Sequence, residues 1–66
     1  MTVGEAIRKY RKEKGFTQVQ LSKMCGISQQ HISDIEKGKC IPNWNTLLTI
    51  CKNLSLVIKV TEADHE

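Results

Sequence analysis

The chain has 66 residues, three cysteines and a net charge of +3. A chain of this length forms one small domain with a marginal core, which leaves no second domain to build a catalytic cleft. No apolar run reaches the length of a membrane span, so we expect no membrane association. An odd number of cysteines without a CxxC pair or a signal peptide favours free thiols and a cytoplasmic location.

Positive charge is concentrated in the first two thirds of the chain. Residues 1–40 contain eight Lys and Arg against four Asp and Glu, whereas residues 41–66 contain two against three. A basic segment of this kind suits a polyanionic partner such as nucleic acid. A solvated basic face without any partner explains the charge equally well, so the motifs have to decide.

The first predicted element is an amphipathic helix over residues 3–14. Its apolar positions recur at helical spacing and are Val3, Ala6, Ile7 and Tyr10. Gly15 follows and can take the left-handed conformation that a helix C-terminus prefers. Phe16 then offers an apolar contact back onto this helix.

Two short helices separated by a single turn come next. Thr17 and Gln20 form a capping-box pattern that opens the second helix. The predicted buried face of this helix consists of Leu21, Met24 and Cys25. Gly26 ends the helix, and Ser28 is the natural N-cap of a third helix that runs through Lys37 and stops at Gly38.

A fourth helix is predicted to begin after Pro42, with Asn43 as its cap. Its apolar positions spread over a wide arc, which predicts that this helix is the most buried of the four. They are Trp44, Leu47, Leu48, Ile50, Cys51 and Leu54.

The sequence pattern changes to a period of two after Asn53, where "LSLVIKVTE" reads as one β-strand. The rest of the chain contains no partner for this strand, and an open apolar strand edge promotes association. We therefore expect the strand to pair with the same strand of a second copy. The residues assigned to this dimerisation are Leu56, Val57, Ile58 and Val60. A strand folded back onto its own helices is the alternative.

The third helix has two contrasting faces. Ile32 and Ile35 lie on one side, and a compact set of polar side chains lies on the other: Gln29, Gln30, Ser33 and Lys37. Glutamine amides both donate and accept, so they can pair with the N6/N7 edge of adenine in the major groove of DNA. Any amphipathic helix has a polar face, but a helix that follows a short glycine-containing turn can project that face outwards.

Three sequence motifs occur in a characteristic order over residues 3–54. They are Thr17-Gln18-x-x-Leu21, Gly26-Ile27-Ser28-Gln29-x-x-Ile32-Ser33-x-x-Glu36-x-Gly38 and Pro42-x-x-x-Thr46-Leu47. In these motifs the chain resembles the Cro and phage-repressor (Xre-type) helix-turn-helix family. The resemblance implies an all-α fold, a compact lambda-repressor-like bundle of four to five helices, with double-stranded DNA as partner.

The resemblance also implies roles for individual residues. Thr17 and Gln18 would face the DNA backbone, with Gln18 able to brace Gln29. The recognition helix would enter the major groove with Ser28, Gln29 and Gln30, followed one turn later by Ser33 and Asp34, and Lys37 would meet a phosphate. Arg11 and Glu36 match a pair that forms an ion pair in many relatives; a surface Arg and Glu that never meet is the alternative.

Two residues depart from the family pattern. His31 stands where a small residue is usual, and Asp34 brings negative charge close to the DNA. Asp34 could accept a hydrogen bond from cytosine N4, or it could repel DNA and so sharpen selectivity. The residues leave both alternatives open.

Metal binding and catalysis are not expected. The spacings between Cys25, Cys40 and Cys51 fit no zinc-ligand pattern, and no cofactor is predicted. Ser28, His31 and Asp34 form a triad in name only, because they lie on one short helical stretch without a cavity.

The sequence therefore predicts a DNA-binding domain over residues 1–54 and a dimerisation strand with an acidic tail over residues 55–66. We interpret the protein as a homodimeric regulator, a repressor in the first instance, that occupies a palindromic operator. The alternative is an antitoxin that binds a toxin protein and represses its own operon.

Overall fold

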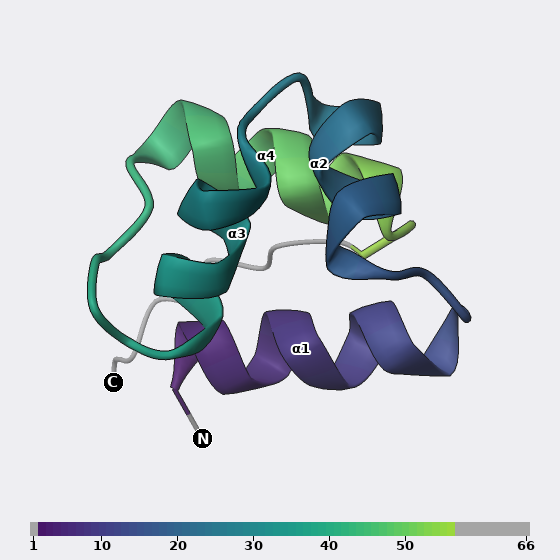
Figure 1. Cartoon of the computed structure of the whole chain (residues 1–66), viewed down its shortest axis with the longest axis horizontal. Helices are drawn as coiled ribbons and strands as arrows, with labels where there is room; N and C mark the ends of the chain where they lie inside the picture. The colour runs from purple at the N-terminus through teal and green to yellow at the C-terminus, as the bar shows by residue number, and fades with distance from the viewer. Residues whose placement is uncertain (1, 57–66) are drawn as a thin grey trace, which may run out of the picture.

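The computed structural model describes residues 2–56, and these residues form a small helical domain. Its elements are α1 (Val3–Glu13), α2 (Gln18–Cys25), α3 (Gln29–Glu36) and α4 (Trp44–Asn53). Figure 1 shows α1 running beneath α2 and α3, with α4 behind them. The all-α prediction is confirmed with four helices in this part of the chain. The first three residues of the predicted strand, residues 54–56, lie in this part and form the C-cap of α4 and a turn instead of a strand; the other six lie outside the described residues.

Each helix begins at a side chain that caps its free backbone N–H groups. The predicted capping box of α2 is present: the Thr17 hydroxyl accepts from the Gln20 N–H at 3.0 Å, and the Gln20 side chain accepts from the Thr17 N–H at 2.8 Å. Ser28 caps α3 and Asn43 caps α4, as predicted. α1 has a second capping box, formed by Thr2 and Glu5, which was not predicted from the sequence. Caps of this kind matter here because helices of 8 to 11 residues are marginal by themselves.

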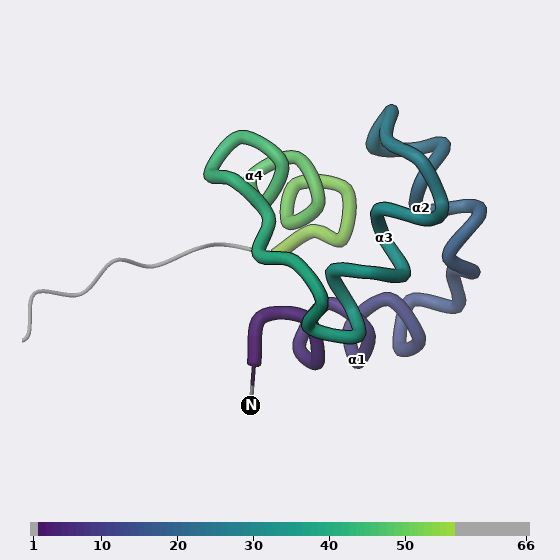
Figure 2. Tube along the Cα trace, turned by 60° about the vertical axis from the view of Figure 1, so that its left-hand side comes forward, coloured from purple at the N-terminus to yellow at the C-terminus, as the bar shows by residue number. Residues whose placement is uncertain are grey.

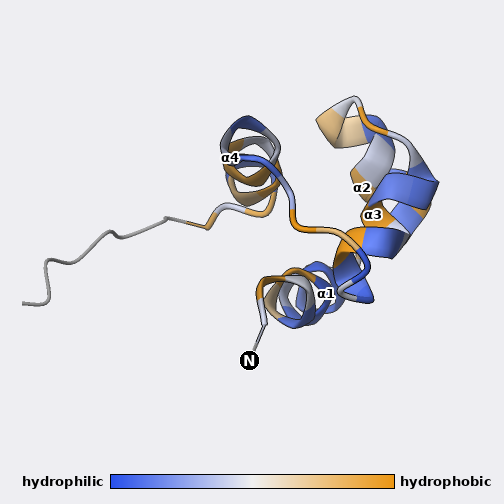
Figure 3. Cartoon of the chain, turned by 90° about the vertical axis from the view of Figure 1, so that its left-hand side faces the viewer, coloured by the Kyte–Doolittle hydropathy of each residue, from blue (hydrophilic) through white to orange (hydrophobic). Residues whose placement is uncertain are grey.

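One apolar side chain cluster joins all four helices. Its fully buried members are Ile7, Leu21, Ile32, Ile35, Ile50 and Leu54. Figure 3 shows the hydrophobic faces of the helices turned toward one another and the hydrophilic faces turned outward. The core therefore lies where the helical periodicity of the sequence placed it.

Three predicted core residues are exposed instead. Met24 is 40% exposed, Trp44 is 56% exposed and Leu48 is 41% exposed. The prediction that they are buried is wrong. For Trp44 and Leu48 the reason is that α4 packs mainly against α2 and leaves part of its wide apolar arc uncovered. The third helix also ends one residue earlier than predicted, at Glu36, with Lys37 as its C-cap.

The described chain ends with a turn that brings Leu56 back to the domain. Ser55 takes a left-handed φ of +57°, and the Leu56 N–H donates to the Cys51 carbonyl oxygen at 2.7 Å. The Leu56 side chain is partly buried against the core cluster of its own chain. Val57, Ile58 and Val60 lie outside the described residues, so their role in dimerisation stays a prediction.

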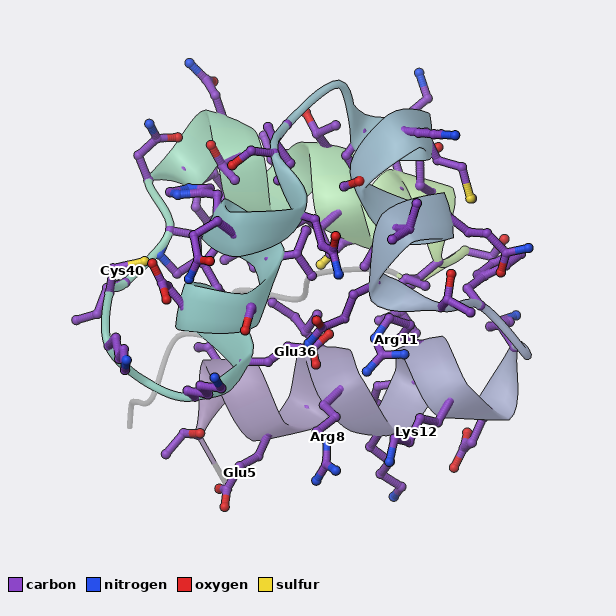
Figure 4. All side chains as sticks on the ribbon, in the orientation of Figure 1. Glu5, Arg8, Arg11, Lys12, Glu36 and Cys40 are labelled. Atoms are coloured by element: carbon purple, nitrogen blue, oxygen red, sulfur yellow. The ribbon has the colours of Figure 1, made fainter. Side chains whose placement is uncertain are left out.

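A buried ion pair connects α1 to α3. The Arg11 guanidinium donates from Nε to Glu36 Oε2 at 2.7 Å and from Nη2 to Glu36 Oε1 at 3.0 Å. The two side chains are only 8% and 2% exposed. The alternative of a surface Arg and Glu that never meet is therefore wrong. Figure 4 shows the two side chains pointing toward one another between the helices.

Two further hydrogen bonds complete this network. Arg11 Nη1 donates to the Phe16 carbonyl oxygen at 2.8 Å, and Gln18 Nε2 donates to Glu36 Oε1 at 3.0 Å. Burial acts to raise the pKa of Glu36, but the hydrogen bonds from Arg11 and Gln18 and the positive charges of Arg11 and Arg8 outweigh it, so the pKa is lowered. The network fixes α1, the start of α2 and the end of α3 relative to one another.

Close approach of α1 to α3 requires a glycine inside α1. A Cβ atom at Gly4 would overlap the Ile35 carbonyl oxygen and lie 3.0 Å from the Glu36 carbonyl oxygen. Gly4, Ile7 and Arg11 are the buried residues of α1 and lie on one face. Glycine lowers helix propensity, so its presence here reflects packing against the end of α3.

We expect Gly4→Ala to destabilise the domain by about 1–3 kcal/mol, because the added methyl group forces α1 away from α3. The gain in helix propensity, at most about 1 kcal/mol, only partly offsets this cost. Urea unfolding followed by circular dichroism measures the difference. Lys12→Ala, at an exposed position of the same helix, is the control and should be nearly neutral. A Gly4→Ala variant more stable than the wild type would contradict the close contact.

We expect Glu36→Gln to cost about 3 kcal/mol at pH 7, because it leaves the Arg11 charge buried without a counter-charge. The folded pKa of Glu36 is lowered, so its stabilising contribution is complete above about pH 4.5 and is lost as the pH falls from there through the lowered value. Urea unfolding between pH 7 and pH 3 should therefore show a flatter pH dependence for the variant.

The double variant Arg11→Met/Glu36→Leu keeps the experiment interpretable if the single variant does not fold. Replacing both charges by apolar groups avoids an uncompensated buried charge, so this protein should be more stable than the single variant. Equal pH dependence of the wild type and the charge-free protein below pH 4.5 would show that Glu36 is not responsible.

Candidate nucleic-acid interface

The helices α2 and α3 form a compact helix-turn-helix unit. Gly26 closes α2 with a left-handed φ of +71°, and Ser28 opens α3 two residues later. The Ile27 N–H donates to the Ser22 carbonyl oxygen at 3.1 Å, and the Ile27 side chain packs against the core. The turn is thereby fixed, and the view in Figure 2 shows α2 and α3 adjoining each other on the side away from α4.

The two faces of α3 are separated as the periodicity predicts. Ile32 and Ile35 are buried in the core, and the Glu36 side chain is buried in the ion pair. Gln29, Gln30 and Lys37 are exposed, and Ser33 is half-buried. In Figure 3 the outer face of α3 is hydrophilic over its length. The amide side chains at positions 29 and 30 therefore stand on the outside of the molecule.

The two glutamines differ in their surroundings. Gln30 Nε2 donates to Asp34 Oδ1 at 2.9 Å, so these two side chains form a pair one turn apart on the outer face of α3. Within residues 2–56, the Gln29 side chain forms no hydrogen bond to the protein. Gln29 is thus free to use both its donor and its acceptor toward a partner.

The expected contact between Gln18 and Gln29 is not present. Gln18 instead donates to Glu36, because a buried carboxylate forms stronger hydrogen bonds than a neutral amide. Thr17 is exposed at the start of α2, with its hydroxyl engaged in the capping box. Gln18 therefore lies beside the end of α3 and is bonded to Glu36 rather than to Gln29.

Arg8, on the exposed side of α1, lies beside the Glu36 network. An open cleft of about 540 Å³ lies between α1 and the end of α3, and Arg8, Gln18, Glu36 and Lys37 are among the residues that line it. The positive charge of Arg8 helps to lower the pKa of Glu36. The helical wheel of α1 could not predict that Arg8 lies near Glu36, because Glu36 belongs to α3.

The structure provides no arrangement for metal or nucleophilic chemistry in the residues it describes. No group of three His, Cys, Asp or Glu in this part of the chain could hold a metal ion. Burial raises the pKa values of Cys25 and Cys51. The Ser28 hydroxyl accepts from the His31 backbone N–H at 3.0 Å, so this serine serves as a helix cap.

None of the helices in residues 2–56 is long and apolar enough to cross a membrane.

Comparisons with known proteins identify the same unit. The sequence profile of the helix-turn-helix family matches residues 7–57. The chain is 41% identical over 63 residues to the ImmF control region 10 kDa protein of Bacillus phage phi105, which covers 91% of this chain and 70% of that protein. It is 36% identical over 58 residues to the immunity repressor protein of the same phage, which covers 88% of this chain and only 40% of the relative.

A solved structure agrees with this relationship. The P22 c2 repressor protein, crystallised in complex with a synthetic operator, superposes with a TM-score of 0.82 at 37% sequence identity, covering 86% of each chain. The Arg11–Glu36 pair, the capped two-helix unit and the polar outer face of α3 occur together within the matched residues. The chain therefore belongs to the helix-turn-helix family of DNA-binding transcriptional regulators of the Cro and phage-repressor type.

Proposed function

We propose that this protein is a transcriptional repressor that binds a palindromic operator as a homodimer. The observation that carries the proposal is the outer face of α3, where Gln29 and Gln30 are exposed on a helix held rigidly from behind. Two of its relatives support the same function, since one is named an immunity repressor and the P22 c2 repressor was solved on operator DNA.

In this proposal α3 lies in the major groove and the flanking groups meet the backbone. Ser28, Gln29 and Gln30 lead the helix toward the bases, and Ser33 and Asp34 follow one turn later. Thr17, at the start of α2, and Lys37, at the end of α3, offer a hydroxyl and an ammonium group to the phosphates that flank the groove. Residues 2–56 carry nine Lys and Arg against four Asp and Glu, which favours a polyanion.

We infer a homodimer because the outer face of α3 in one copy can contact only a few base pairs. Only the first turns of α3 reach base edges, whereas a two-fold pair of helices reads two half-sites about one helical turn apart. We assign the contact between copies to Val57, Ile58 and Val60, with Leu56 partly committed to its own core. The dimer represses by occupancy, because it covers DNA that polymerase needs, and it acts in the cytoplasm.

The antitoxin alternative adds a toxin partner to the same DNA-binding domain. It stays a prediction from the sequence. A toxin gene beside this reading frame, and a stable complex of the two products, would support it.

We expect Gln29→Ala to weaken binding at the cognate operator by about 1–3 kcal/mol and to leave binding to unrelated DNA nearly unchanged, because an amide lost from a base edge affects one sequence only. Lys37→Ala is the contrasting variant and should weaken all sequences alike. Fluorescence anisotropy with the operator, selected from random DNA, and with a scrambled duplex measures both. A uniform loss for Gln29→Ala would reassign this residue to the backbone.

We expect operator binding to weaken steeply with salt. If each subunit contacts roughly three phosphates, the slope of log K against log salt concentration is about −5 for the dimer. Lys37→Ala removes one phosphate contact from each subunit and should make the slope of the dimer shallower by about two units, whereas Lys52→Ala on α4 should leave it unchanged. A binding constant that does not depend on salt would contradict the proposed interface.

A further inference from the structure

The Gln30–Asp34 pair has a defined donor and acceptor. An ionised carboxylate only accepts hydrogen bonds, so the bond of 2.9 Å from Gln30 Nε2 to Asp34 Oδ1 fixes which end of the Gln30 amide faces the aspartate. The same bond holds the aspartate against the helix by its Oδ1 atom. Two side chains that are flexible separately thus form one unit on the outer face of α3.

The groups left free on this unit are mainly acceptors. Asp34 Oδ2 makes no hydrogen bond within residues 2–56, and the Gln30 carbonyl oxygen is likewise free. The only donor left on the pair is the second N–H of the Gln30 amide, and the pair carries a negative charge. Gln29 differs, because its amide keeps a full donor and a full acceptor.

The edges of the four bases respond differently to such an acceptor unit. In the major groove guanine offers only acceptors, and thymine offers an acceptor and a methyl group. Adenine offers the N6 donor, but its N7 acceptor lies beside it and repels a carboxylate. Cytosine offers the N4 donor without a neighbouring acceptor on the same base. A carboxylate brought against guanine or thymine loses water and gains no hydrogen bond, which penalises those bases.

We propose that Asp34, held in place by Gln30, selects a cytosine in each operator half-site by accepting a hydrogen bond from its N4 amine. Gln29 reads a separate position, where its free amide matches adenine. The inference rests on the proposed DNA-binding function and assigns unequal roles to two adjacent glutamines. It takes the first of the two alternatives that the sequence left for Asp34, because the hydrogen bond from Gln30 holds the carboxylate in one place on the outer face of α3.

The test compares the wild type with Asp34→Asn, which keeps the size of the side chain and removes its charge. An operator is first selected from random DNA with the wild-type protein. Dissociation constants at one salt concentration are then measured for this operator and for duplexes carrying each of the other three base pairs at every half-site position. Gln29→Ala is measured on the same duplexes as the control, and circular dichroism verifies that both variants fold.

For the wild type we expect one position where cytosine is preferred by roughly tenfold or more over the other bases. Asp34→Asn should reduce this preference to less than about threefold and leave the preferences at the other positions unchanged. Gln29→Ala should leave the cytosine preference intact and relax a different position. These results together would establish the assignment.

Other outcomes would overturn it. If Asp34→Asn binds every duplex more tightly by the same factor, Asp34 acts only through repulsion. If the wild type prefers cytosine at no position, or if Asp34→Asn keeps the same cytosine preference, the Gln30–Asp34 pair does not recognise this base, although the protein is still a sequence-specific binder. Failure of the wild type to select any sequence would instead overturn the proposed function itself.

Discussion

The orientation of the outer face of α3 depends on the buried ion pair between Arg11 and Glu36. The carboxylate receives two hydrogen bonds from the guanidinium and one from Gln18, and the remaining Nη1 of Arg11 donates to a backbone carbonyl group. A buried charge is tolerated only when it is satisfied in this way, so the pair permits essentially one placement of α1, the start of α2 and the end of α3. An apolar contact of equal area would allow the helices to slide, because hydrophobic packing is not directional.

The hydrophobic core contains only six buried side chains, so the domain needs the ion pair as a further constraint on how its helices pack. The four helices are short, and each is stabilised at its start by a side-chain cap rather than by length. Gly4 contributes to the same packing, because the absence of a side chain lets α1 approach the carbonyl groups at the end of α3. Stability and the orientation of α3 are therefore not separate properties here, since one contact region, at the end of α3, provides both.

Local pattern in the sequence was enough to predict the four helices, the caps of α2, α3 and α4 and the main core, because these depend on neighbours within one or two turns. Thr17, Ser28 and Asn43 are examples, and so are Ile32 and Ile35 on the inner face of α3. Features that depend on how helices cross were not predictable in this way. A helical wheel cannot tell that Trp44 is left exposed, that Gly4 lies against a carbonyl oxygen or that Gln18 donates to Glu36. The Arg11–Glu36 pair became an expectation only through the family resemblance.

The consequences for recognition follow from where α3 is held. Its last residue, Glu36, is anchored by the ion pair, and its first turn is anchored by the Ser28 cap and the buried Ile32. A helix fixed at both ends cannot roll to improve a poor contact, so each outer side chain must adapt by itself. Gln29 retains that freedom, whereas Gln30 and Asp34 restrict each other through their hydrogen bond. A restricted charged pair loses less conformational entropy on binding and tolerates mismatched bases less well than a free amide does. In the proposed interface, selectivity would therefore arise as much from the contacts that immobilise α3 as from the groups that would face the DNA.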